Sequence, residues 1–155
     1  MTFQIHPLDP APFADLFDLS DEELAARDAV RMVSDKPVGF PCRVSLEDAA
    51  PGEELILCNY AHQSEATPYA ASHAIFVKRG AEAATPAPGE TPEVLRRRVL
   101  SVRAFDEDHM MIAGDVAAGD ELGDRIDAAF ADPAVDYVHI HFAGRGCFAA
   151  KATRA

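Results

Sequence analysis

The chain has 155 residues, 48% of them hydrophobic, which suits one domain with a buried core and excludes a disordered chain. Its 14 basic against 26 acidic residues give a formal charge of −12, which repels phosphate backbones and anionic lipids, so we expect no nucleic-acid or membrane partner. The first residues lack the pattern of a secretory signal and no apolar stretch could span a bilayer, so a cytoplasmic location is expected.

In the first half of the chain, the clearest predicted helix follows Ser20. Ser20 and Glu23 form a capping box, Leu19 and Leu24 can pack across it, and the helix is expected to reach about Asp28. The predicted strands of this half cover residues 3–6, 29–34, 42–46, 54–60 and 72–78. The last two have apolar residues on both faces, which is typical of strands in the middle of a covered sheet, and a polar loop, 61–71, separates them.

The second half is expected to begin with a long loop. Residues 80–92 are rich in Ala, Pro and Gly without periodicity, which predicts a mobile surface loop or a lid. Thr91 and Pro92 then suit the N-cap and first turn of a short helix. The longest predicted helix covers residues 120–131, and its apolar stripe includes Leu122 and Ile126.

Two hairpins complete the second half. Strands are predicted over residues 99–105, 110–116, 137–142 and 147–153. The acidic turn 106–109 joins the first pair and reads as a solvated tip. Gly144 and Arg145 join the second pair, and glycine in the first central position favours a type II′ turn.

These elements predict an α+β fold with a largely antiparallel or mixed sheet of about eight strands and two or three helices. Hairpins outnumber strand–helix–strand units, which disfavours a doubly wound sheet. No repeat or linker divides the chain, so residues 1–155 are expected to form a single domain, with the loop near 80–92 inside it. The sequence leaves open whether the chain forms a homo-oligomer.

The most suggestive motif for function is His139-Ile140-His141. Because side chains alternate along a strand, both imidazoles project from one face, where they can share a metal or an anionic ligand. A third ligand must come from elsewhere, and His62 or His73 could supply it. Histidines on a half-exposed strand face are the simpler interpretation, since a catalytic zinc needs three protein ligands and no third spacing is visible. We therefore assign no metal ligand.

His73 opens a strand that is apolar on both faces, directly after a polar loop that contains Tyr69 and Ser72. Loops carried by rigid strands often hold binding residues. An equally favoured interpretation is that His73 is structural and forms a hydrogen bond with the backbone of the loop at the end of its strand.

Cys147 follows the last turn, and its position suggests a catalytic Cys–His pair in which His141 activates the thiol as a nucleophile. With a two-residue turn, however, Cys147 faces the same side as Phe142, opposite the histidines. A buried, inert thiol is therefore favoured, and Cys42 and Cys58 read as core residues. Three scattered cysteines also form no disulfide framework.

Basic residues are scarce, so their clustering is informative. Arg96, Arg97, Arg98 and Arg103 lie close together in the sequence, and Arg145 lies in the last turn. Arginine binds carboxylate and phosphate in a bidentate manner, so an anionic small molecule is one interpretation. Surface pairs with the surplus carboxylates are the favoured one.

Four segments together resemble a catalogued family. They are FPCRVSLEDAAPGEELILCNY (40–60), TPYAASHAIFV (67–77), RRRVLSVRAFD (96–106) and VHIHFAGRGCFAAK (138–151). The chain resembles, from about Phe40 onward, the bacterial family of domain of unknown function 1203. The resemblance implies a bacterial single-domain protein without an assigned activity, and it supplies no catalytic residues.

The leading hypothesis is a domain that binds a small polar or anionic molecule, either as a binding protein or as an enzyme. Its pocket is expected between the 61–72 loop and the last hairpin, lined by Tyr69, Ser72, His73, His139, His141 and Arg145. One alternative is an acidic protein–protein interaction module without catalysis, and another is a metal-dependent enzyme that uses His139 and His141. No cofactor is assigned.

Overall fold

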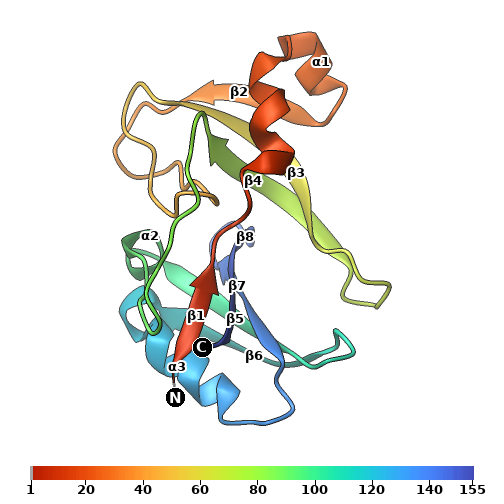
Figure 1. The fold of residues 1–155 in the computed structure, drawn as a ribbon, viewed down its shortest axis with the longest axis vertical. Coiled ribbons are helices and arrows are strands. Elements are labelled where there is room, and N and C mark those ends of the chain that lie inside the picture. Colours follow the sequence, from red (N-terminus) through yellow and green to blue (C-terminus); the bar gives the residue numbers. More distant parts are fainter. Residues whose placement is uncertain (1) are drawn as a thin grey trace.

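The chain forms two separate antiparallel sheets in the computed structural model, which describes residues 2–155 (Figure 1). The strands are β1 (Phe3–His6), β2 (Ala29–Val33), β3 (Glu54–Gln63), β4 (Ala71–Lys78), β5 (Val99–Phe105), β6 (Met111–Ala118), β7 (Tyr137–Phe142) and β8 (Phe148–Arg154). The helices are α1 (Asp21–Ala25), α2 (Glu93–Arg96) and α3 (Leu122–Phe130), with 3₁₀ segments η1 (Ala11–Asp18) and η2 (Gly119–Glu121). The predicted α+β class with antiparallel strands is confirmed.

The prediction of one sheet of about eight strands was wrong. The five-stranded sheet has the order β1-β8-β7-β5-β6, and the three-stranded sheet has the order β2-β3-β4. Residues 80–92 leave the end of β4 and run to α2 without a tight turn, so β5 pairs with β6 and β7 instead of with β4 (Figure 1). β1 pairs with β8, which brings the two ends of the chain together.

Each sheet has its own apolar core. The α3 stripe of Leu122, Ile126 and Phe130 is buried against the five-stranded sheet, as the 3.6-residue spacing of that stripe requires. The three-stranded sheet is covered by η1 and by Leu24 of α1. The capping box of Ser20 and Glu23 is present, but α1 ends at Ala25 rather than near Asp28. Asp28 has a φ of 53°, so the chain has already turned toward β2.

The three-stranded and five-stranded halves of the molecule meet in part through polar and charged contacts. Gln63 at the end of β3 donates to the Tyr137 hydroxyl over 2.7 Å, and Arg98 forms a bidentate ion pair with Asp48. The long segment 80–92 is also bonded to the region of each sheet. The Ala84 amide donates to the carbonyl of Val44, beside the three-stranded sheet, and the Gly89 amide donates to the carbonyl of Phe3, in β1 of the five-stranded sheet. Whether this segment moves stays a prediction.

The strand predicted over residues 42–46 is instead part of a loop. The Cys42 amide donates to the Glu47 carbonyl and the Leu46 amide donates to the Cys42 carbonyl, which closes a turn around Arg43 to Ser45. Only single bridges, Cys42 to Phe76 and Pro41 to Asp48, connect this loop to an extended partner. Its apolar residues are buried nevertheless, Cys42 and Val44 in the core of the three-stranded sheet and Leu46 in the core of the five-stranded sheet.

Two further boundaries differ from the prediction. β3 continues to Gln63, so the loop predicted over 61–71 is shortened and His62 lies on a strand. β4 lies at the edge of its sheet, so the expected central position holds for β3 alone. The N-cap of α2 is Pro92 rather than Thr91.

The last hairpin does not contain the predicted type II′ turn. That turn needs a positive φ at Gly144, whereas the positive φ, 82°, is at Gly146. The Gly146 amide donates to the Phe142 carbonyl over 2.8 Å, and the Phe142 amide donates to the Cys147 carbonyl. The turn is therefore wider, and Phe142 faces both Gly146 and Cys147.

Candidate metal centre

Three histidines from both sheets meet in one cluster. His139 and His141 project from β7 of the five-stranded sheet, and His62 projects from β3 of the three-stranded sheet. One ring nitrogen from each lies within 4.8 Å of the others. The His62 ring meets the His141 ring edge-on, with centroids 4.7 Å apart, and the His139 centroid lies 6.0 Å from that of His62. We call these residues the histidine cluster.

Two β-bulges lie beside the histidine cluster. One extra residue is inserted into β3 between Tyr60 and Gln63, at the position of His62. A second irregularity separates the pairs Ile140–Ala150 and His141–Phe148. Bulges re-aim side chains and are frequent next to functional sites. Here they set the positions of His62 and of Phe148, whose ring stacks on the His62 ring at 5.4 Å.

His139 and His141 are buried, with 4% and 1% of their surface exposed, so the expectation of a half-exposed strand face was wrong. The rings of His139 and His141 are covered by His62 of β3 and by Phe148 of β8. His62 is half-buried, which leaves one side of the cluster near solvent.

Each histidine of the cluster has one buried ring nitrogen without a hydrogen-bond partner. These are Nδ1 of His62, Nδ1 of His139 and Nε2 of His141. Among the described residues only five buried side-chain atoms lack a partner, and three of them belong to this cluster. A buried polar atom without a partner costs about 1–3 kcal/mol, and three of these five atoms lie together in this cluster.

The second nitrogen of His141 fixes the orientation of its ring. Nδ1 lies 2.9 Å from the carbonyl oxygen of Gly146, which can only accept, so Nδ1 carries the hydrogen and Nε2 keeps a free lone pair. Metal-bound histidines are usually held by such a bond from the opposite nitrogen. The wide turn that places Gly146 therefore also fixes the His141 ring with its Nε2 toward the other two histidines.

All three imidazoles are neutral at neutral pH. Burial lowers the pKa of His139 and of His141 to about 3, with the neighbouring cationic groups as smaller causes for both residues. Burial likewise lowers the pKa of His62 to about 4. Neutral imidazole is the form that binds metals.

Two cations lie beside the histidine cluster. Arg103 on β5 is opposite His139 in the sheet register, and its Nε donates to the Ser101 hydroxyl over 3.1 Å. Lys151 on β8 is the other neighbour of His139, with its Nζ 4.3 Å from the centre of the Tyr137 ring. Among the described residues neither cation has a carboxylate partner within 4.0 Å. The surroundings of the cluster therefore favour an anion.

The six residues expected to line one pocket fall into separate places. His139 and His141 belong to the histidine cluster. His73 and Arg145 line a different cavity between the sheets, which we call the basic cavity. Tyr69 is exposed and meets Phe105 edge-on at 6.3 Å, while Ser72 is exposed at the start of β4 and lines neither site.

The basic cavity has a volume of about 510 Å³. It is lined by Lys36, Gly39, Pro41, Arg43, Leu57, His73, Ala74, Phe76, Arg98, Val99, Phe142, Gly144, Arg145 and Cys147. Sequence reasoning missed Arg43, which is 2% exposed and lies in the loop that was predicted as a strand. The motif FPCRVS is the signal that could have revealed it, because an arginine is unusual among apolar neighbours.

Cys147 lies on the side of the hairpin away from the histidine cluster. It packs with Phe142 in the core of the five-stranded sheet, and its Sγ lies 3.2 Å from Nη2 of Arg43. His141 is instead paired with Phe148, so a Cys147–His141 pair does not form. That the thiol is inert stays a prediction.

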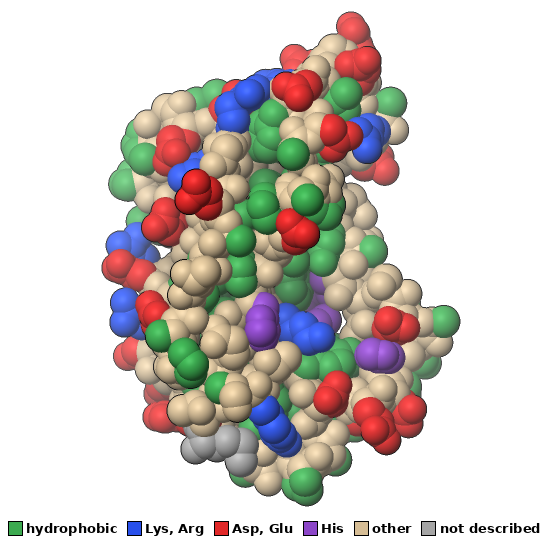
Figure 2. All heavy atoms as spheres, in the orientation of Figure 1, with side chains coloured by type: hydrophobic (Ala, Val, Ile, Leu, Met, Phe, Trp, Pro, Cys, Tyr) green, Lys and Arg blue, Asp and Glu red, His purple; other side chains and the backbone are tan. Residues whose placement is uncertain are grey.

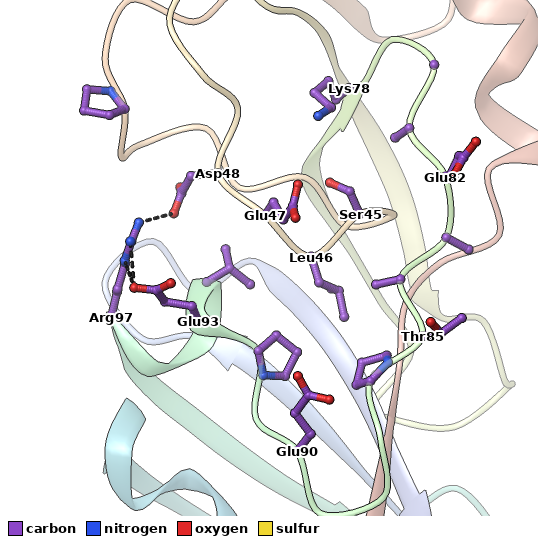
Figure 3. Close-up of a pocket in the computed structure, with 18 residues that line it drawn as sticks. Ser45, Leu46, Glu47, Asp48, Lys78, Glu82, Thr85, Glu90, Glu93 and Arg97 are labelled. Atoms are coloured by element: carbon purple, nitrogen blue, oxygen red, sulfur yellow. Dashed lines mark hydrogen bonds and ion pairs between the residues drawn. The ribbon is translucent and has the colours of Figure 1, made fainter.

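A larger cavity of about 800 Å³ lies under residues 80–92 and has the opposite charge (Figure 3). Five carboxylates and two cations line it: Glu47, Asp48, Glu82, Glu90, Glu93, Lys78 and Arg97. Arg97 pairs with Glu93 and Asp48 at its rim, and Arg98 also pairs with Asp48. The expected surface pair with a carboxylate is present for Arg97 and Glu93, whereas the partner of Arg98, Asp48, is buried.

The structure defines a class of protein: two antiparallel sheets of an α+β fold that meet at a largely buried cluster of three histidines. Residues 39–154 match the family described as protein of unknown function (DUF1203), and the chain belongs to that family. No curated protein and no solved structure matches the chain. No helix in the described residues is long and apolar enough to cross a membrane.

Proposed function

We propose that the protein binds a divalent transition metal through His62, His139 and His141 and acts as a metal-dependent enzyme on a small anionic molecule. The observation that carries the proposal is the set of three buried, unpartnered ring nitrogens, one from each histidine. This is the alternative in which the His139 and His141 pair acquires a third ligand from β3.

The donor set suits zinc and its neighbours in the first transition series. Imidazole nitrogen binds Zn, Cu, Fe and Ni, whereas Mg and Ca prefer oxygen. Zn–N bonds of about 2.0–2.1 Å in a tetrahedral site place the nitrogens roughly 3.4 Å apart, so the cluster closes on a metal with small rotations of the rings. His141 is already held by Gly146.

Three protein nitrogens leave a coordination position open. Catalytic zinc sites have three protein ligands and a water or substrate in the fourth position, whereas structural sites have four protein ligands. No aspartate, glutamate or cysteine joins the three histidines in the described part of the chain. A metal held in this way lowers the pKa of a bound water or polarises a bound substrate.

The charge around the open position selects the ligand. Three neutral imidazoles leave the metal charge uncompensated, and Arg103 and Lys151 add positive charge at the same sheet face. An anion that binds the metal is attracted by both cations, and Arg103 can hold a carboxylate or phosphate oxygen through its planar fork.

Elemental analysis tests the metal. Protein purified without chelator and then dialysed against low-micromolar Zn²⁺ is expected to retain about one zinc per chain. His139→Gln and His141→Gln are expected to lose it, whereas His6→Gln, which changes an exposed histidine bonded to Thr153, is expected to keep it. Zinc content that is the same in all four proteins would show that the cluster is not the site.

Cobalt substitution tests the open position. Co²⁺ bound to three histidines gives visible absorption bands, and added azide is expected to shift them by entering the open position. Bands that do not respond to azide would indicate a closed, structural site and would contradict the catalytic part of the proposal.

A further inference from the structure

We infer that the basic cavity is a second binding site, for a small organic monoanion with an apolar body such as a carboxylate with a hydrocarbon tail. Its volume of about 510 Å³ lies within the 300–1,000 Å³ typical of small-molecule sites. None of the three histidines of the cluster lines it. The inference therefore does not rest on the proposed metal.

The charge of the cavity is opposite to that of the chain. Lys36, Arg43, Arg98 and Arg145 line it together with His73, and no carboxylate does. The chain as a whole has 26 acidic residues against 14 basic ones. Arg98 is neutralised by Asp48, but within the described residues Lys36, Arg43 and Arg145 have no carboxylate within 4.0 Å. Three uncompensated cations at one cavity of an acidic protein are arranged for an anion.

The burial of Arg43 is the strongest evidence that the cavity binds an anion. It is 2% exposed, and its guanidinium donates to the carbonyls of Phe148 and Pro41 and to Sγ of Cys147. A guanidinium has five N–H groups, so two remain unused. Burying a charge without an opposite charge is expensive, and an anion in the cavity would compensate it.

The walls of the cavity select the body of the ligand. Leu57, Phe76, Val99 and Phe142 line it beside the cations. Val99 is 57% exposed although it is a large apolar residue, so an occupant would remove it from water. The Phe142 ring already lies under the guanidinium of Arg43, with 4.9 Å from Cζ to the ring centre.

A small hydrophilic anion fits these walls less well. None of the residues that line the cavity lies in a helix, so no helix N-terminus offers it the backbone amides that bind a phosphate. Cations on one side and hydrocarbon on the other instead match an amphiphilic ligand with one charged head.

The test uses 8-anilinonaphthalene-1-sulfonate, a fluorescent sulfonate with an aromatic body. We expect saturable fluorescence enhancement with about one probe per chain. Octanoate is expected to displace the probe at a concentration at least about tenfold lower than octanol, which has the same tail without the charge. Inorganic phosphate is expected to displace it no better than octanol does.

Two variants of equal charge locate the site. Lys36→Gln with Arg145→Gln removes the two exposed cations of the cavity and is expected to weaken probe binding at least about tenfold. Arg27→Gln with Arg125→Gln removes two exposed arginines that pair with Asp15 and Asp115 elsewhere, and is expected to leave probe affinity within about twofold. Both variants keep the fold, because all four changed side chains lie on the surface.

The inference would be overturned by a lack of saturable binding, by equal weakening in the two double variants, or by equal competition from octanol and octanoate. Preferential displacement by phosphate would replace the amphiphile with a hydrophilic anion and would also overturn it. His139→Gln is expected to bind the probe normally. Failure of the metal proposal therefore leaves this inference standing, and the reverse also holds.

Discussion

At the scale of single residues, Arg43 joins the two halves of the molecule. Its guanidinium connects its own loop to the backbone of β8, because it donates to the carbonyls of Pro41 and Phe148. Burial lowers its pKa to about 10, which still leaves it protonated at neutral pH. A single buried cation thus donates to a carbonyl of its own loop and to a carbonyl of β8.

Arg43→Met is therefore expected to lower the free energy of unfolding by about 2–4 kcal/mol, because it leaves those carbonyls buried without donors. Arg43→Lys is expected to recover only part of the loss, since an ammonium cannot bond both carbonyls in the planar arrangement of a guanidinium. Urea unfolding measures both. Arg27→Met at an exposed ion pair is the control and should change stability by less than about 1 kcal/mol. A similar small loss for Arg43→Met would contradict this role.

At the scale of elements, η2 and α2 pack so closely that only glycine fits between them. A Cβ at Gly119 would lie 2.2 Å from the carbonyl oxygen of Leu95 and 2.4 Å from that of Arg96. These are backbone atoms, so neither can move aside without a shift of α2. The contact holds α2 against the end of β6, at the start of α3.

Gly119→Ala is expected to destabilise the protein by about 3 kcal/mol or more, at the upper end of the cost of overpacking. Gly144→Ala is the matched control, because nothing lies within 4 Å of its Cβ position and its φ is not positive. We expect that control to stay within about 0.5 kcal/mol of the parent in urea unfolding. A loss below about 1 kcal/mol for Gly119→Ala would mean that α2 shifts freely.

The elements also show what the sequence could predict. Local signals worked where local chemistry decides: the capping box at Ser20, the stripe of α3, and the bounds of β1 and β7. The division into two sheets depends on which strands pair over long distances, and no local pattern contains that information. The strand predicted over residues 42–46 was wrong for a related reason, since the apolar residues of this loop are buried by tertiary contacts and not by strand pairing.

For the site, alternation along β7 correctly placed His139 and His141 on one face, and His62 was considered as a third ligand beside His73. The sequence could not choose between these two because the choice depends on the bulge in β3. One inserted residue reverses the alternation of the side chains after it. The sequence also could not show that His73 lines the basic cavity while His62 completes the histidine cluster.

At the scale of the whole molecule, a metal in the histidine cluster would connect the two sheets. His62 comes from the three-stranded sheet and the other two ligands come from the five-stranded one (Figure 1). On the face seen in Figure 2, histidine side chains are visible near the middle of the molecule with a basic side chain beside them, while acidic and other basic side chains are spread over the rest of the surface. A cross-link at this level would oppose separation of the halves.

Zinc is therefore expected to raise the midpoint of thermal unfolding. A ligand that binds only the folded state adds about 2.7 kcal/mol at a free concentration of one hundred times its Kd. For a chain of this size that corresponds to a shift of about 5–10 °C. Calorimetry of chelator-treated protein with and without Zn²⁺ measures it, and addition of excess chelator should reverse it.

The double variant His139→Gln/His141→Gln is expected to show no shift with Zn²⁺, and Mg²⁺ is expected to have no effect on the parent because it prefers oxygen ligands. An equal shift in the double variant would place the stabilising zinc elsewhere, for example at the carboxylates of the larger cavity. If His62→Gln reduces the zinc-induced rise of the midpoint as much as His141→Gln does, both sheets supply ligands. His62 is the only residue of the three-stranded sheet in the cluster among the described residues.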